Sequence, residues 1–343
     1  MRPRPSLLDT PSQPAEAGGA EHAAVGPWFP AGASKAHRIR AVQRRQHYRG
    51  ALLGLAAGDA LGTTLEFERP GSFEPLGDMI GGGPFGLEPG QWTDDTSMAL
   101  CLAESLIECG GFDPGDQMRR YLRWYRHGHL SSTDRCFDIG NATRGALQRF
   151  ERDDNPYAGS TDPETAGNGS IMRLAPVPLL YANDPVEAVA RAADSSRTTH
   201  AAETAIDGCR LLAALIVGAL TGVRKDELLA PDFWTHGRLH PEIAAIARGS
   251  FREKEPPEIR GGGYVVHSLE AAIWALDRSS SFEEGALLAV NLGDDADTTG
   301  AVYGQLAGAL YGEAAIPERW REQLALRGTI ELFADSLWEA ATT

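Results

Sequence analysis

The sequence contains only four cysteines, Cys101, Cys109, Cys136 and Cys209. They form no C-x-x-C motif, and no spacing between a cysteine and a histidine fits a zinc site. The pattern therefore argues against both a disulfide framework and a cysteine-based zinc module. We expect the four residues to be small, buried and apolar, in a reducing compartment.

Basic residues are also few, because 32 Lys and Arg stand against 47 Asp and Glu and give a net charge of −15. Such a surface would repel a polymeric nucleic acid, so nucleic acid is not the expected partner. No apolar run is long enough to span a bilayer, and the N-terminus has no apolar segment typical of a secretory signal. We expect a cytoplasmic protein without a membrane partner.

No segment shows the strict alternation and β-branched enrichment that are typical of a strand. Stretches rich in Ala and Leu have helical periodicity instead, and both residues favour helices. These stretches are residues 36–55, 96–109, 116–124, 141–150, 201–220, 268–276, 282–290 and 299–311. They predict an all-α fold in which residues 37–343 form a single compact multi-helix domain. Residues 1–36, rich in Pro, Ala and Gly, are predicted to be a disordered tail.

The first motif that carries chemistry is Gly58-Asp59-Ala60-Leu61-Gly62, followed by Glu66. Glycine destabilises a helix relative to alanine, so either another segment approaches the backbone closely here or the helix ends. Glu66 would lie beyond that break, in a loop that allows it to point inward. From this motif alone, a helix end with a solvated Glu66 is the favoured interpretation.

Two clusters of Asp and Thr each precede a predicted helix, W-T-D-D-T-S at 92–97 and G-D-D-A-D-T-T-G at 293–300. Capping of a helix explains one Asp or Thr in each cluster, but not several adjacent carboxylates that repel one another. Carboxylate oxygens are the ligands that Mg²⁺ and Mn²⁺ prefer. We therefore predict that the two clusters meet in space around a dinuclear metal site.

Three further features are weaker. The loop G-N-G-S-I-M-R at 167–173 offers backbone N–H groups suited to a phosphate, although a plain loop is the favoured interpretation of this motif by itself. Asp138 lies among apolar neighbours, where a raised pKa would suit an acid or base, but a helix cap is equally consistent. His200 precedes a long apolar helix, where a lone His is more often structural than catalytic.

The order of these segments resembles the ADP-ribosylglycohydrolase family. The segments are GALLGLAAGDALGTTLEF, GQWTDDTSMAL, CFDIGNATRGAL, GNGSIMRLAPVPLL, THAAETAIDG, GGYVVHSLEAAIWAL and NLGDDADTTGAVYGQLAGALYG, and they extend from Arg49 to Gly312. T-D-D-T paired with D-x-D-T, with G-N-G-S-x-M-R between them, is a highly specific combination, although no single piece is. The resemblance implies an all-α fold of that type with a central cleft that holds two Mg²⁺ or Mn²⁺ ions.

The resemblance also implies roles for individual residues. The implied metal ligands are Thr93, Asp94, Asp95, Asp295, Asp297 and Thr298. Glu66 and Asp138 match the acids expected to be catalytic. The residues implied to bind ADP-ribose are Asn168, Gly169, Ser170, Met172, His200 and Tyr264. This sequence departs from many relatives at Asp294, which stands where they have glycine and adds a charge beside the metal ligands.

The implied activity is metal-dependent hydrolysis of the glycosidic bond between ADP-ribose and a modified acceptor, which releases ADP-ribose. The first guess for the acceptor is an arginine on a protein, from the likeness to the family's enzyme that acts on dinitrogenase reductase. A serine, a nucleobase or a small molecule stays open as the acceptor. Glu66 or Asp138 would transfer the proton while the metals orient the ribose and activate water. We expect a monomer.

Two other classes of metal-dependent helical enzyme fit less well. Isoprenoid synthases need D-D-x-x-D on a helix, but Met98 stands where the third acid would be. Phosphohydrolases of the His-Asp type need an adjacent His-Asp pair, which this sequence lacks. A non-catalytic member of the same fold, which binds ADP-ribose or is purely structural, is the alternative, and the complete set of acids argues against it.

Overall fold

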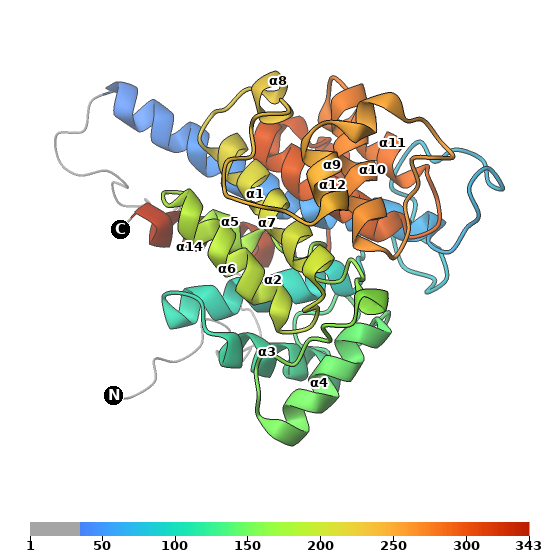
Figure 1. The fold of residues 1–343 in the computed structure, drawn as a ribbon. Helices are drawn as coiled ribbons and strands as arrows, with labels where there is room; N and C mark the ends of the chain where they lie inside the picture. The colour runs from blue at the N-terminus through green and yellow to red at the C-terminus, as the bar shows by residue number, and fades with distance from the viewer. Residues whose placement is uncertain (1–34, 343) are drawn as a thin grey trace, which may run out of the picture.

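The computed structural model describes residues 35–342, with side chains from residue 44 onward. The predicted disordered tail lies outside the described residues except for Lys35 and Ala36, which begin the first helix (Figure 1). The longer helices are α1 (Lys35–Gly62), α2 (Asp94–Cys109), α3 (Pro114–His127), α4 (Asn141–Asp153), α6 (Pro185–Arg197), α7 (Glu203–Leu220), α10 (Val265–Arg278), α11 (Phe282–Val290), α12 (Ala296–Tyr311) and α14 (Arg327–Thr342). The short ones are α5 (Pro176–Leu180), α8 (Lys225–Leu228), α9 (Pro241–Ala247) and α13 (Glu318–Gln323).

The fold is all-α, as the sequence predicts. The described residues contain isolated β-bridges but no sheet, and none of their helices is long and apolar enough to cross a membrane. Every stretch with predicted helical periodicity is a helix, with ends that differ by a few residues. The sequence analysis missed the longer helices α6 and α14 and the short helices α5, α8, α9 and α13. The buried residues of α14, Ile330, Phe333, Ala334, Leu337 and Trp338, nevertheless follow the three- and four-residue spacing of an amphipathic helix.

The cysteines only partly match the prediction that all four are buried. Cys101 and Cys209 are buried and Cys136 is intermediate, but Cys109 is exposed. Cys109 is the last residue of α2, where the helix runs out of the core, so its neighbours no longer cover it. All four are free thiols.

The centre of the molecule is the contact between α1 and α12, which Figure 1 shows side by side. Glycines repeat every four residues along both helices, at 50, 54, 58 and 62 and at 300, 304 and 308. A Cβ atom built on Gly58 would lie 2.0 Å from the carbonyl oxygen of Gly300, and one on Gly304 would lie 1.9 Å from that of Gly54. The two backbones therefore touch directly, which is the close approach that Gly58 and Gly62 suggested.

We expect replacement of Gly304 by alanine to destabilise the protein by about 1–3 kcal/mol or more, because the added methyl group meets a backbone carbonyl that cannot move alone. Gly328 of α14 is a matched control, since a Cβ there meets nothing within 4 Å. Gly328→Ala should be neutral or slightly stabilising. Chemical unfolding of both variants measures the difference, and equal stabilities would contradict the close packing of α1 on α12.

Candidate active site

One cleft of about 820 Å³ gathers most of the residues that the sequence singles out. Its walls come from the segment after α1, the start of α2, the loop before α4, the loop 160–172 and the start of α12. The candidate residues that line it are Glu66, Asp94, Asp138, Asn168, Gly169, Met172, His200, Tyr264, Asp295, Asp297 and Thr298. These residues come from segments that are far apart in the sequence, from Glu66 to Thr298, and they meet at one place.

Asp59 fixes the first Asp/Thr cluster, a role that the sequence analysis did not assign. It is fully buried on α1 and accepts four hydrogen bonds, from the backbone N–H and the hydroxyl of both Thr93 and Thr96, at 2.6–3.0 Å. The start of α2 is therefore capped by a residue of another helix, and Thr93 makes no capping bond of its own. Asp94 and Asp95 are therefore not needed as helix caps, which was one interpretation of this cluster from its sequence.

The two Asp/Thr clusters meet as predicted. The Thr93 hydroxyl lies 3.1 Å from Oδ2 of Asp297, and the Thr298 hydroxyl lies 3.5 Å from Oδ1 of Asp95. Both contacts join positions more than 200 residues apart in the chain. Thr93 and Asp95 are almost fully buried beneath the cleft and do not line it, whereas Asp94, Asp297 and Thr298 do.

Glu66 and Asp138 complete the acidic group. One carboxylate oxygen each of Glu66, Asp138 and Asp297 lies within 4.8 Å of the others, an arrangement that would fit one metal ion. Glu66 is only 5% exposed, so the solvated position favoured for it from its motif alone is wrong. The helix does end at Gly62, but the short turn 63–65 then directs Glu66 back into the protein.

Two backbone hydrogen bonds tie the segment after Glu66 to the second cluster. Phe67 donates to the carbonyl of Asp294, and Asp294 donates to the carbonyl of Glu68, both at 2.7 Å. Asp294, the departure noted in the sequence, has φ of 61°, a conformation that glycine adopts more readily. Its side chain points toward Gly262 rather than into the acidic group, so the extra charge lies beside the group and not within it.

Burial dominates the electrostatics of the acids. Burial, followed by repulsion from neighbouring carboxylates, raises the pKa of Asp94, Asp95 and Asp297 well above the usual value. Burial also raises the pKa of Asp138 to about 7 and, together with the charge of Asp138, that of Glu66 to about 10. Such a set of carboxylates cannot all be ionised in the fold unless positive charge is added.

The donor set fits divalent cations. Oδ2 of Asp95, Oδ1 of Asp297 and Oε2 of Glu66 are buried oxygens without a hydrogen-bond partner in the described part of the chain. Unpartnered buried carboxylate oxygens are costly, and they are the hard ligands that Mg²⁺ and Mn²⁺ bind. Asp295, which accepts a hydrogen bond of 2.8 Å from the Asn168 amide, borders the same group.

The glycine-rich loop forms another part of the cleft wall. Asn168, Gly169 and Met172 line it, with His200 and Tyr264 beside them. Ser170 does not line the cleft, because its hydroxyl points inward and accepts a hydrogen bond from Ser196. The implied role of Ser170 in the loop that holds ADP-ribose stays a prediction. Tyr264 donates a hydrogen bond of 2.7 Å to Glu242 at the rim.

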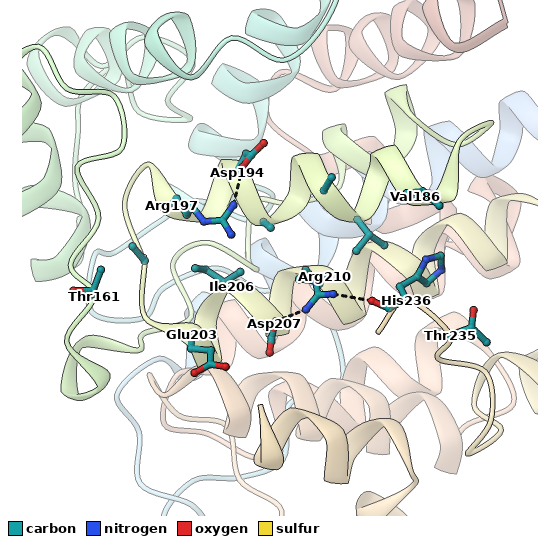
Figure 2. A pocket seen from close by; sticks show the side chains of 14 residues that line it. Thr161, Val186, Asp194, Arg197, Glu203, Ile206, Asp207, Arg210, Thr235 and His236 are labelled. Carbon is teal, nitrogen blue, oxygen red and sulfur yellow. Dashed lines mark hydrogen bonds and ion pairs between the residues drawn. The ribbon is translucent and has the colours of Figure 1, made fainter. Parts of the chain in front are cut away.

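A second groove of about 870 Å³ lies between α6 and α7 (Figure 2). Four of its charged residues are already paired, Arg197 with Asp194 and Arg210 with Asp207. None of the residues that the sequence singled out lines it. Two short segments, 160–161 and 200–201, separate this groove from the acidic cleft. Ser160 and His200 line the cleft, whereas Thr161 and Ala201 line the groove. The acidic cleft, and not this groove, is therefore the candidate active site.

Comparisons with known proteins agree with this geometry. The chain is 46% identical to the "ADP-ribosylarginine hydrolase Tri1" of Pseudomonas putida, over 90% of this chain and 82% of that protein. It is 32% identical to the "ADP-ribosyl-[dinitrogen reductase] glycohydrolase" of Rhodospirillum rubrum, over 81% of this chain and 90% of that protein. A solved structure titled "ADP-ribosylglycohydrolase-related protein complex" superposes with a TM-score of 0.79 at 49% identity, covering 88% of this chain and 99% of that one.

The profile of the ADP-ribosylglycohydrolase family matches residues 40–343, which is nearly the whole of the described chain. The match includes the acidic cleft, the glycine-rich loop and the central pair α1 and α12. The family resemblance that the motifs suggested is confirmed by this match, by the relatives and by the fold. On these grounds the chain belongs to the ADP-ribosylglycohydrolase family.

Proposed function

We propose that this family member hydrolyses the N-glycosidic bond between ADP-ribose and an arginine side chain of a modified protein. The observation that carries the proposal is the meeting of buried, partly unpartnered carboxylates from both Asp/Thr clusters in one cleft. The acceptor is inferred from two relatives named as ADP-ribosylarginine hydrolases, at 46% and 44% identity. The proposed location is the cytoplasm.

Two Mg²⁺ or Mn²⁺ ions are the proposed cofactors. Asp94, Asp95 and Asp297 would be the principal ligands, with Asp295, Thr93 and Thr298 completing the set. When bound, the cations would supply the positive charge that holds the ribose hydroxyls and makes water a better nucleophile at neutral pH. Asp59 would keep the start of α2 in position for this set, because it holds both Thr93 and Thr96.

Glu66 and Asp138 are the proposed proton-transfer residues. Hydrolysis adds water to the anomeric carbon, breaks the bond from that carbon to the guanidine nitrogen and places a proton on that nitrogen. One carboxyl group has to accept a proton from water, and one has to give a proton to the leaving nitrogen. Both residues lie in the same three-acid group at the cleft, and burial raises the pKa of each. With a pKa of about 10 Glu66 holds a proton at neutral pH, whereas Asp138, with a pKa of about 7, can hold or release one.

The test uses Glu66→Gln and Asp138→Asn with an ADP-ribosylated arginine protein as substrate. Each variant should hydrolyse the bond about 10² to 10⁴ times more slowly than the parent protein, since each loses one proton-transfer group. Glu68→Gln is the matched control, because Glu68 is exposed and lies two residues away in the same loop. Full activity in both active-site variants would overturn the proposed roles.

The acceptor is tested in the same assay. Proteins modified on arginine or on serine are offered separately, with Mg²⁺ and with Mn²⁺. ADP-ribose should be released faster from arginine than from serine. Faster release from serine would overturn the acceptor but leave the hydrolase. Binding of ADP-ribose without hydrolysis of any acceptor would instead favour a non-catalytic member of the family.

A further inference from the structure

Arg173, the last residue of the glycine-rich motif, is a buried cation without an acidic partner. Its exposed fraction is 0%, and no carboxylate of the described residues lies within ion-pair distance of it. Its guanidinium lies 4.6 Å from the ring centre of Tyr121, and it donates to the Thr199 hydroxyl at 2.7 Å. Its Nε has no acceptor. A buried charge is costly unless it is paired, so a negatively charged ligand nearby would stabilise the Arg173 guanidinium.

Thr199 links Arg173 to His200. The Thr199 oxygen lies 2.7 Å from Arg173 Nη2 and 2.9 Å from His200 Nδ1. Arginine can only donate, so the hydroxyl oxygen accepts from Arg173 and its hydrogen is free to point to Nδ1. Burial, with the charge of Arg173, lowers the pKa of His200 to about 3, so the imidazole is neutral and Nδ1 can accept. The hydrogen of the imidazole is then on Nε2.

Nε2 of His200 faces the glycine-rich wall of the cleft. His200 is only 3% exposed, yet it lines the cleft, and within the described chain Nε2 has no hydrogen-bond acceptor. The ring packs on Gly169 so closely that a Cβ atom there would lie 2.7 Å from Cε1 and 3.2 Å from Nε2. A donor on a nearly buried ring that lines a cleft and has no acceptor in the described chain indicates a ligand that brings the acceptor.

We propose that Arg173 is a positioning residue that makes this wall bind the pyrophosphate of ADP-ribose. It acts through Thr199, which orients His200 so that Nε2–H donates to a phosphate oxygen, and its own charge offsets that of the phosphates. The rest of the cleft is acidic, so a dianionic group needs such an offset. The identity of the ligand rests on the proposed function. Arg173 does not line the cleft, whereas Arg149 does and would meet the ligand directly.

The test compares binding of ADP-ribose with binding of adenosine, which lacks phosphates, by calorimetry on the full chain. Arg173→Met and Thr199→Val should each weaken ADP-ribose binding by about tenfold or more and leave adenosine binding within about twofold. Arg173→Lys should recover part of the loss because it restores the charge. Arg152→Met, at an exposed arginine that pairs with Asp153 on α4, is the control and should change neither ligand.

A spectroscopic measurement separates this role from a merely structural one. The ¹⁵N shifts of His200 should report a neutral ring with hydrogen on Nε2 in the parent chain, and a mixture of the two neutral forms in Thr199→Val. An equal loss of affinity for both ligands, or unchanged ADP-ribose affinity in a folded Arg173→Met, would overturn the inference. If Arg173→Met does not fold, Thr199→Val decides by the same criteria.

The two proposals fail separately. Binding needs no turnover, so a parent chain that binds ADP-ribose with this dependence on Arg173 and yet hydrolyses nothing would overturn only the proposed function. A chain that hydrolyses ADP-ribosylarginine at full rate, with ADP-ribose affinity indifferent to Thr199→Val, would overturn only the inference.

Discussion

Replacement of Asp297 by asparagine is expected to abolish binding of divalent cations and to slow hydrolysis by at least about a thousandfold. Asp297 is 2% exposed, and its Oδ1 has no hydrogen-bond partner among the described residues. Asparagine keeps the shape and still accepts a hydrogen bond from Thr93, but it removes the charge at the point where both Asp/Thr clusters meet. The expected loss is therefore a loss of metal binding and not of the fold.

Stability should change in the opposite direction to activity in this variant. Burial and neighbouring carboxylates raise the pKa of Asp297, so folding without metal forces this group to keep a proton that the unfolded chain releases. Asparagine pays no such cost, and the Tm of the metal-free variant should exceed that of the metal-free parent. Calorimetry with Mn²⁺, turnover and thermal unfolding in EDTA measure the three effects.

Asp232→Asn is the control for Asp297→Asn, because Asp232 is exposed and far from the cleft residues in sequence. It should leave cation binding, turnover and Tm unchanged. Undiminished turnover in Asp297→Asn, with cations still bound, would contradict the metal site as assigned. A lower Tm of the variant in EDTA would instead contradict the raised pKa of Asp297.

The metal-free protein is also expected to lose stability as the pH rises from about 5 to 8. The buried acids have folded pKa values above the unfolded value of about 4, at about 6 for Asp59 and about 7 for Asp138. A raised folded pKa contributes stability that is fully present below the unfolded pKa and is lost as the pH rises through the folded one. The sum over these coupled groups should be on the order of several kcal/mol.

Thermal unfolding in EDTA across this pH range measures the loss, and saturating Mn²⁺ should reverse the slope because cations replace the protons. The window avoids lower pH, where the opposite effect begins. Arginine hydrogen bonds lower the pKa of Asp335, so its contribution is lost only as the pH falls through that lowered value. A Tm in EDTA that stays flat or rises between pH 5 and 8 would count against the buried acidic group.

The helices and the two Asp/Thr clusters could be predicted from sequence because their signals are local. Periodicity of about 3.6 residues predicted most of the longer helices, although α6 and α14 were missed, and α11 has the predicted ends, Phe282 and Val290. Excess carboxylates at two helix starts pointed to cations, because one cap needs only one acceptor. The four-residue glycine repeat along α1 was visible too, and it is the signal that would have predicted the close contact with α12.

Other parts of the site depend on contacts between distant segments. Asp59 lies in an apolar stretch of α1 and has no local feature that shows whether it accepts hydrogen bonds from Thr93 and Thr96. The motif of Glu66 favoured a solvated position for the same reason, since the turn at residues 63–65 sets the direction of its side chain. Arg173 drew attention only as part of a motif, although its lack of an acidic partner is what distinguishes it.

The sequence by itself therefore determined the helical class, the kind of ligand that the acids prefer and the family. Only the tertiary structure decided which acids share one cleft, which residue caps α2 and how His200 is oriented. The physical reason is that periodicity and capping act within a few residues, whereas the site forms where α1 and α12 pack backbone against backbone. That packing brings Asp59 and Asp297 to the same threonine, Thr93, across more than 200 residues.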